Sequence, residues 1–458
     1  MKRIIFSFTI ILFTVVLVHR CDAQTGSPPV SMSSQACVQE ARKNNAGLRG
    51  SVARVAAADA KASEAFSALL PQVRLTSRFA QLSDIDPFSV TAPGLGSLTL
   101  FPNIDHSYSA RVSVQQLVFS GFRLMNNLDA ARLNATATQE DFIRDEHDLI
   151  LEVKRTYWSL ARARHAEEFI RQTVEQVSEH LRDVQNFNKQ GLATENDVYK
   201  VEVQLADIKL KLIEAESNRR LITMALNNLM GKPLDVAIIP TEDPELTAPP
   251  LDTLDMVLNT PSALLNGARE HRPELKATRA RKEMSEAGVA MARAGWYPQV
   301  ALSAGYDYAR PNQRIIPPKD RWEGTWDVGL TMQWNLWDWF TTANQVSQAQ
   351  AAVRQTEAGL EQLENAVAMQ VAQHYWTMEA ARQKRVVAKK GVGQAMENHR
   401  VTNEKFKRGL ATNTDLLDAE VALLQSKLND LQANIDYQIA YANVIHAAGM
   451  SYDQAETK

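Results

Sequence analysis

The chain has 458 residues, with 50 Lys and Arg against 53 Asp and Glu, and a formal net charge of −3. No excess of positive charge is available to neutralise phosphates, so the composition argues against nucleic acid as a partner. A hydrophobic content of 45% and a mean hydropathy of −0.29 exclude a polytopic helical membrane protein and a disordered chain. Gly and Pro number only 19 and 17, which predicts few loops and long helices.

Residues 1–23 have the pattern of a cleaved signal peptide. Two basic residues precede an apolar run over residues 4–18, which is shorter than the roughly 20 residues that span a bilayer. Ala23 is the small residue expected at the cleavage point. A lipoprotein signal using Cys21 is the alternative, but a bulky, charged arginine precedes that cysteine. Cleavage would leave Cys37 as the only cysteine, so we expect no intrachain disulfide.

The rest of the sequence contains two copies of one pattern. Residues 156–160, Thr-Tyr-Trp-Ser-Leu, recur as His-Tyr-Trp-Thr-Met at 374–378, an offset of 218. The tetrapeptide Gly-Leu-Ala-Thr at 191–194 recurs at 409–412 with the same offset. Because internal repeats define the building unit of a fold, the two copies predict a duplicated architecture.

A third match lies further upstream and has a different offset. Pro-Gln-Val at 71–73 recurs at 298–300, an offset of 227. The first copy therefore carries about nine extra residues between this match and the next. The stretch 84–106, rich in Pro, Gly, Ser and Thr, is the place where they fit, because length variation concentrates in exposed loops.

Hydrophobic periodicity predicts the same order of elements in each copy. Ala-rich segments predict helices, and alternation with period two predicts strands. In the first repeat, residues 24–261, we expect a helix at 34–69, strands at about 72–82 and 106–120, a long helix at about 122–189, a helix at about 195–230, and an equatorial linker at 231–261. In the second repeat, residues 262–458, we expect a helix at 262–296, strands at about 298–309 and 325–338, a long helix at about 340–407, and a helix at about 413–449.

The last helix of each repeat carries the spacing of a coiled-coil seam. In the second repeat the seam is Leu417, Val421, Leu424, Leu428, Leu431 and Ile435, and in the first it is Tyr199, Val203, Ala206, Leu210 and Ile213. Two short helices together match the length of one long helix. We therefore expect helix 195–230 to stack on helix 262–296, and helix 413–449 on helix 34–69.

The strands have one apolar and one polar face. Trp326, Val328, Leu330 and Met332 alternate with polar residues, and six of the eight tryptophans lie between residues 296 and 339, as in aromatic girdles at a bilayer surface. Four strands cannot enter a membrane alone, because an open edge leaves unpaired backbone groups in hydrocarbon. Several chains would have to share one barrel, and three would supply twelve strands. A soluble hairpin packed on a core is the alternative.

With its duplicated helix, hairpin and helix plan, its Pro-Gln-Val strand entries and its paired Gly-Leu-Ala-Thr turns, the chain resembles TolC-type outer-membrane efflux proteins. The resemblance covers about residues 34–450. It implies an α+β membrane protein: a homotrimer with a twelve-strand β-barrel in outer-membrane lipid that continues into a twelve-helix periplasmic α-barrel. It implies transport of drugs or secreted polypeptides, with no catalysis and no cofactor. The implied partners are a periplasmic adaptor and an inner-membrane RND or ABC transporter.

The resemblance also implies a periplasmic mouth lined by acidic residues after the second tip turn. Asp415 and Asp418 match this position and would form rings of carboxylates in a trimer. The alternative role of Asp415 is a capping box with Thr412, which Thr194 and Asp197 repeat in the first copy.

The family's latch at this mouth does not carry over. The sequence has Phe406 and Ala411 where a tyrosine and an arginine are expected. Asp197 matches an acidic latch partner by position. Phe406 is a candidate hydrophobic gate or an ordinary core aromatic of the coiled coil.

Six residues at the two turns are candidate contacts with the adaptor, and they are Gly191, Leu192, Thr194, Gly409, Leu410 and Thr412. Each glycine is also expected to end its long helix with a positive φ. Arg74, Arg78 and Arg111 are expected to face the barrel lumen, because a charge on the lipid side costs up to about 2–4 kcal/mol at mid-depth.

No other chemistry is indicated. The histidines show no metal-ligand spacing, and no phosphate loop or nucleophile elbow occurs. A periplasmic coiled-coil scaffold or adhesin remains the alternative function. An exported hydrolase is disfavoured, because no nucleophile and base can be paired.

Overall fold

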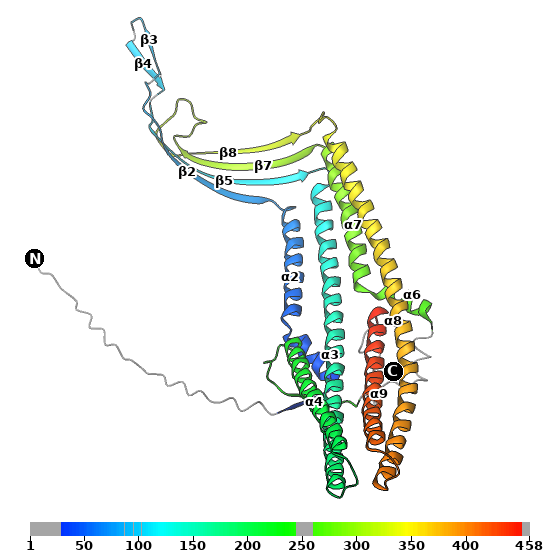
Figure 1. Cartoon of the computed structure of the whole chain (residues 1–458). Coiled ribbons are helices and arrows are strands. Elements are labelled where there is room, and N and C mark those ends of the chain that lie inside the picture. Colours follow the sequence, from blue (N-terminus) through cyan, green and yellow to red (C-terminus); the bar gives the residue numbers. More distant parts are fainter. Residues whose placement is uncertain (1–28, 87, 95, 102, 244–259, 451–458) are drawn as a thin grey trace, which may run out of the picture.

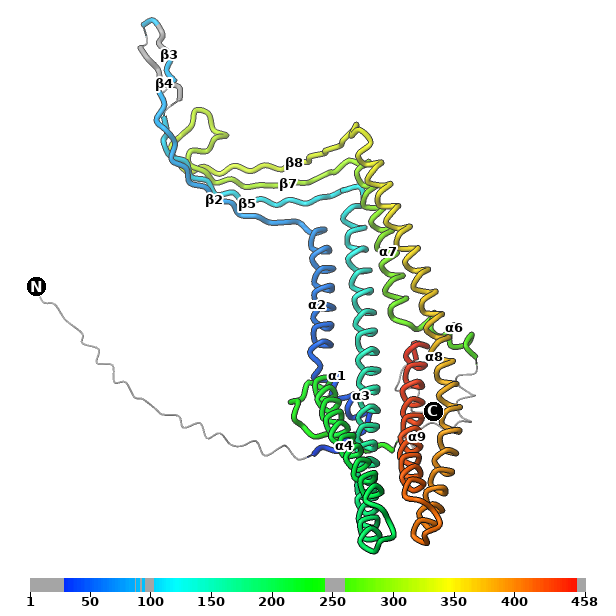
Figure 2. The backbone as a smooth tube through the Cα atoms, in the orientation of Figure 1, coloured from blue at the N-terminus to red at the C-terminus, as the bar shows by residue number. Residues whose placement is uncertain are grey.

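The computed structural model describes residues 29–86, 88–94, 96–101, 103–243 and 260–450. The expected signal peptide, Cys21 and most of the expected linker lie outside these residues. Figure 1 shows an elongated bundle of helices with a curved sheet that bends away from its upper end. The same path is traced in Figure 2.

Two long helices run the length of the bundle. Helix α3 (Arg123–Lys189) and helix α8 (Thr341–Lys407) have 67 residues each, about 100 Å at 1.5 Å per residue. Neither contains a proline after its start. Each begins directly after a phenylalanine in the left-handed region, Phe122 with φ 67° and Phe340 with φ 65°. The two helices are thus equivalent at the offset of 218.

The lower half of the bundle is a single layer of four helices. Helix α4 (Glu195–Leu229) returns beside α3, and α9 (Asn413–Ala447) returns beside α8. Helix α9 also packs on α3, so the order across the layer is α4, α3, α9, α8. Helices α4 and α8 are the two outer members of this layer in the described part of the chain.

The upper half has the order α2, α3, α7, α8. In each repeat, the helix expected before the first strand is broken into two helices. Helices α1 (Ser34–Asn44) and α2 (Ala46–Ser67) are separated by Asn45, whose side chain caps α2 by accepting from Leu48 N at 3.0 Å. Helices α6 (Pro261–His271) and α7 (Pro273–Arg293) are separated before Pro273, which cannot donate a backbone hydrogen bond. A short 3₁₀ helix, η1 (Ala294–Trp296), follows α7.

The expected end-to-end stacking is wrong. Helix α2 stacks on α4 and α7 stacks on α9, within one repeat in both cases. The reason lies at the ends of α4 and α9. A Cβ on Gly231 would lie 2.8 Å from the carbonyl oxygen of Asn44, and one on Gly449 would lie 3.0 Å from Arg272 N. Each glycine therefore lets a short helix end directly on the helix break of its own repeat.

The main sheet is open and antiparallel. Its strands are β2 (Gln72–Gln81), β5 (His106–Phe119), β7 (Gln299–Arg310) and β8 (Glu323–Gln333), in that order. Strands β2 and β8 are its free edges among the described residues. The strand expected at 325–338 ends at Gln333, because no strand of the described chain pairs with the residues that follow.

Sequence reasoning missed two small sheets. The stretch expected to be a loop, 84–106, contains a hairpin of β3 (Phe88–Ala92) and β4 (Gly96–Phe101) that projects beyond the main sheet. Its residues alternate as strands do, and Gly94 with φ 88° forms part of its turn. Strands β1 (Val30–Met32) and β6 (Ile238–Pro240) pair in parallel at mid-length.

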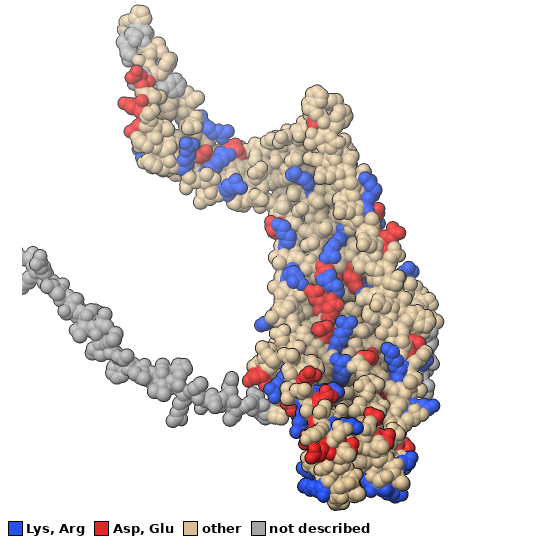
Figure 3. Space-filling view, in the orientation of Figure 1, with Lys and Arg blue, Asp and Glu red and all other residues tan. Residues whose placement is uncertain are grey.

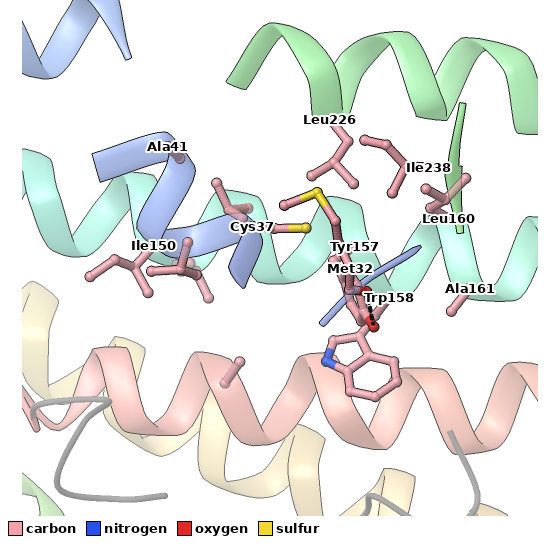
Figure 4. Close-up of a cluster of buried hydrophobic side chains, with 14 of the residues drawn as sticks. Met32, Cys37, Ala41, Ile150, Tyr157, Trp158, Leu160, Ala161, Leu226 and Ile238 are labelled. Carbon is pink, nitrogen blue, oxygen red and sulfur yellow. Dashed lines mark hydrogen bonds between the residues drawn. The ribbon is translucent and has the colours of Figure 1, made fainter. Parts of the chain in front are cut away.

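The largest core lies where the upper and lower helices meet. Tyr157 and Trp158 of α3 pack there with Met32 and Ile238 from the small parallel sheet and with α1, α4 and α9 (Figure 4). The Tyr157 hydroxyl donates to the carbonyl oxygen of Met32 at 3.2 Å. Burial raises the pKa of Tyr157 to about 12. This core joins the first repeat to the second.

The seam expected in α4 is uncovered among the described residues. Tyr199, Val203, Leu210 and Ile213 are exposed. The face packed on α3 is instead formed by Val201, Leu205 and Ile208. Both stripes are apolar, so helix α4 has two candidate packing faces, and the part of the chain that the structure describes covers one of them.

Candidate functional site: helical tips and sheet

The two tip turns have the same geometry. Gly191 and Gly409 have φ 75° and 71° and end α3 and α8. Leu192 N donates to the carbonyl oxygen of Phe187 at 2.8 Å, and Leu410 N does the same to Lys405 at 2.8 Å. This is the Schellman pattern of helix termination. It leaves the side chains of Leu192 and Leu410 exposed at the lower end of the molecule.

A capping box follows each turn. Thr194 N donates to Asp197 Oδ2 at 3.1 Å, and Asp197 N donates to Thr194 Oγ1 at 3.2 Å. Thr412 and Asp415 repeat this pair at 2.8 and 3.2 Å. The hydrogen bonds from the threonine hydroxyl and backbone lower the pKa of each aspartate. Both carboxylates therefore stay ionised at neutral pH.

The structure brings the two tips into contact. The amide of Asn413, which is buried, donates to the carbonyl oxygen of Asp197 at 3.1 Å. Asp415 and Asp418 are three residues apart on the exposed face of α9. The predicted mouth residues Asp197, Asp415 and Asp418 thus lie at one end of the bundle. Figure 3 shows lysines and arginines gathered at the same end.

Phe406 does not offer a free ring to a channel in this conformation. Its side chain is buried, with ring centroids 5.2 Å from His180 and 5.8 Å from Phe187 of α3. The hydrophobic cluster around the ring also includes apolar residues of α4 and α9. The ring therefore packs between the α3–α4 pair and the α8–α9 pair. Of the two roles expected for Phe406, this placement is that of a core aromatic of the coiled coil.

Beside Phe406 lies a buried ionisable pair that sequence reasoning missed. His180 Nδ1 is 3.3 Å from Glu420 Oε2, and the two side chains are 2% and 4% exposed. His180 Nε2 is buried and has no hydrogen-bond partner among the described residues. The pair joins α3 to α9 across 240 residues. A lone helical histidine carries no sequence signal for such a partner.

The polar face of the sheet carries all three predicted lumen arginines. Arg111 Nη2 donates to Asp327 at 2.8 and 3.0 Å, and Arg111 Nη1 lies 3.7 Å from Asp307. Gly305 lies beneath this guanidinium, where a Cβ would come within 2.6 Å of it. Arg74 and Arg78 are on the same face of β2, which is a free edge. Sheet pairing thus gathers charge on one face.

The opposite face is apolar and exposed. Leu75, Val112, Tyr306 and Trp326 are consecutive cross-strand neighbours across all four strands. Trp326 and Trp334 are eight residues apart, about 26 Å at 3.3 Å per residue. Because barrel strands tilt by about 35–45°, this length spans about 20 Å of height, which is most of the apolar band of about 25 Å in outer-membrane barrels.

Among the described residues, no helix is both long and apolar enough to cross a membrane. No group of three His, Cys, Asp or Glu there could hold a metal ion.

Comparisons with known proteins agree on one family. The model for outer membrane efflux proteins matches residues 37–232 and 264–450. Outer membrane protein TolC of Vibrio cholerae is 22% identical over 417 residues, covering 91% of this chain and 90% of that protein. Alkaline protease secretion protein AprF of Pseudomonas aeruginosa is 23% identical over 351 residues, covering 76% and 71%.

Structural comparison gives the same result. The solved structure of outer membrane protein VceC from Vibrio cholerae matches with a TM-score of 0.74 at 18% identity, over 92% of this chain and 96% of that one. This likeness establishes the fold, and the family model covers both repeats. The resemblance inferred from the sequence is therefore confirmed, and the chain belongs to the outer membrane efflux protein family.

Proposed function

We propose that three copies of this chain close into a twelve-strand barrel in the outer membrane, which continues as a twelve-helix tunnel. The observation that carries this proposal is the open sheet. Its apolar face is exposed, and its edge strands β2 and β8 are each unpaired on their outer side in the described chain. Closure by further copies is the way for such a sheet to satisfy its backbone groups in lipid.

The helical layers support the same assembly. The free members of the layers are α2 and α4 on one side and α8 on the other, below the sheet edges β2 and β8. One rotation between copies would therefore close all three layers together. The proposed domains are the two structural repeats, 24–261 and 262–458, behind a cleaved signal peptide at 1–23.

The proposed activity is a passive exit duct for efflux or type I secretion. The family is named for efflux, and one relative is named for alkaline protease secretion, so both small toxic molecules and polypeptides fit as cargo. The proposed partners are a periplasmic adaptor, contacting the exposed Leu192 and Leu410, and an inner-membrane RND or ABC transporter. Asp415 and Asp418 are proposed to line the mouth, and Arg74, Arg78 and Arg111 the barrel lumen.

The test is assembly and conductance of the purified chain. We expect a trimer by light scattering in detergent, with far more helix than strand by circular dichroism, and discrete conductance steps in planar bilayers. A stable monomer in detergent-free buffer with the same circular dichroism would contradict the shared barrel.

A further inference from the structure

The two hairpins of the sheet have the same register, residue for residue. Strands β2 and β5 pair Gln72 with Gln115, and β7 and β8 pair Gln299 with Gln333. The step from Gln72 to Gln299 is the upstream repeat offset of 227, and that from Gln115 to Gln333 is the downstream offset of 218. Strand β7 is thus the equivalent of β2, and β8 the equivalent of β5.

The joint between the repeats is the β5–β7 pairing, in which Val112 lies opposite Tyr306 and Ser113 opposite Gly305. Adding 218 to each β5 residue of this joint gives a residue of β8, and subtracting 227 from each β7 residue gives a residue of β2. The result is a second joint, between β8 of one copy and β2 of another. We propose that neighbouring copies pair in this register, with Leu330 opposite Phe79 of the partner subunit and Thr331 opposite Arg78 of the partner subunit. This inference rests on the proposed trimer and specifies how its copies join.

The register passes a test of side-chain direction. It places Leu330 and Trp334 opposite the partner's Phe79 and the partner's Leu75. The bulge between Leu117 and Phe119 carries over and places Trp337 opposite the partner's Val73. All of these apolar side chains are exposed in the single chain. A slip of one residue would set them opposite polar-face residues instead. The joint therefore continues the apolar face without a break.

The register also accounts for the early end of β8. Residues 334–337 correspond to 116–119 of β5, which form strand because β7 pairs with them. In the proposed joint, residues 73–75 of the neighbouring β2 supply that missing partner. The strand predicted to reach about residue 338 is completed by the second copy.

The helical layers carry an independent sign of the same joint. Leu417, Leu428 and Leu431 of α9 are partly or fully buried in clusters formed with α3. Their equivalents Tyr199, Leu210 and Ile213 on α4 are exposed. Since α8 is the equivalent of α3, the neighbouring α8 is the surface that would cover this stripe.

Disulfide trapping tests the register. The background is Cys37→Ser, because Cys37 is buried and is the single free cysteine of the described chain. In it, Arg78→Cys with Thr331→Cys should give a covalent trimer on oxidation in detergent, seen on non-reducing gels. Phe79→Cys with Leu330→Cys should do the same on the other face. Residues directly opposite lie about 4.5–5.5 Å apart, within disulfide range.

Matched controls shift the register by two residues. Arg78→Cys paired with Gly329→Cys or with Gln333→Cys places the cysteines on a diagonal of about 7–8 Å, and we expect at least tenfold slower trapping. Faster trapping by either control, or a trimer that none of the pairs traps, overturns the register and leaves the duct standing. A monomer by light scattering for the uncrosslinked chain overturns both proposals.

Discussion

Helices α3 and α8 are equivalent in sequence position and length, yet their surroundings differ. Trp158 of α3 is 5% exposed, and its equivalent on α8, Trp376, is 63% exposed. Phe169 of α3 is partly buried, and its equivalent Val387 is exposed. The difference follows from the neighbouring helices, because within the described residues α3 has helices on both sides and α8 has them on one side. An apolar surface at the free side of α8 marks a missing neighbour.

The largest effect is expected from placing charge on that free side. Trp376→Glu together with Val387→Glu should convert the trimer to monomer in detergent, because two carboxylates would be buried without partners in the joint. The helical circular dichroism of the monomer should be retained. Light scattering measures the change.

Lys384→Glu, a charge reversal at an exposed position of α8, is the control and should leave the trimer intact. A trimer that survives the double change at Trp376 and Val387 would show that this side of α8 is not an interface.

The second prediction compares Glu420 with its equivalent Glu202. Glu420→Ala removes one member of a buried pair and should cost about 3–5 kcal/mol, because His180 then lacks its buried partner. Glu202→Ala, at an exposed position of α4, should stay within about 0.5 kcal/mol. Midpoints of urea unfolding in detergent provide the measurement. Equal effects of the two changes would mean that the His180 contact contributes nothing.

The third prediction compares the two tips. If Asp415 and Asp418 form carboxylate rings, their field is screened over about 8–10 Å at physiological salt and acts inside the constriction. Changing both to alanine should lower cation selectivity in planar bilayers and abolish block by trivalent cations. The weakened cap should lower the stability of the fold only modestly. Asp197→Ala is the control. An equal effect of that change would contradict the assignment of the mouth lining to the second repeat.

The pH dependence of the Asp415 cap has a definite sign. Hydrogen bonds from Thr412 lower the folded pKa of Asp415. Its contribution to stability is therefore fully present above the ordinary aspartate pKa and is lost as pH falls through the lower, folded value. The stability difference between the parent chain and Asp415→Ala should thus be constant from pH 8 to about pH 5 and shrink below pH 4.

The repeat, the order of long helices and strands, and the tip turns could be read directly from residues such as Gly191, Gly409 and the two tryptophans at offset 218. These features depend on local rules: helix termination at glycine, strand alternation and helical periodicity. The same rules could not choose between the two apolar stripes of α4, because both have coiled-coil spacing. They also could not pair His180 with Glu420, since no local pattern links them.

The sequence by itself determined the architecture of one repeat and its duplication, because each element follows from the spacing of apolar residues and from the glycines and prolines that end helices. Only the tertiary structure decided which short helix stacks on which, through the close approach of Gly231 to Asn44 and of Gly449 to Arg272. It also decided which surfaces remain uncovered. Trp158 and Trp376 occupy matching positions of the two repeats, each directly after a tyrosine, and their burial depends instead on which helices lie beside them in space.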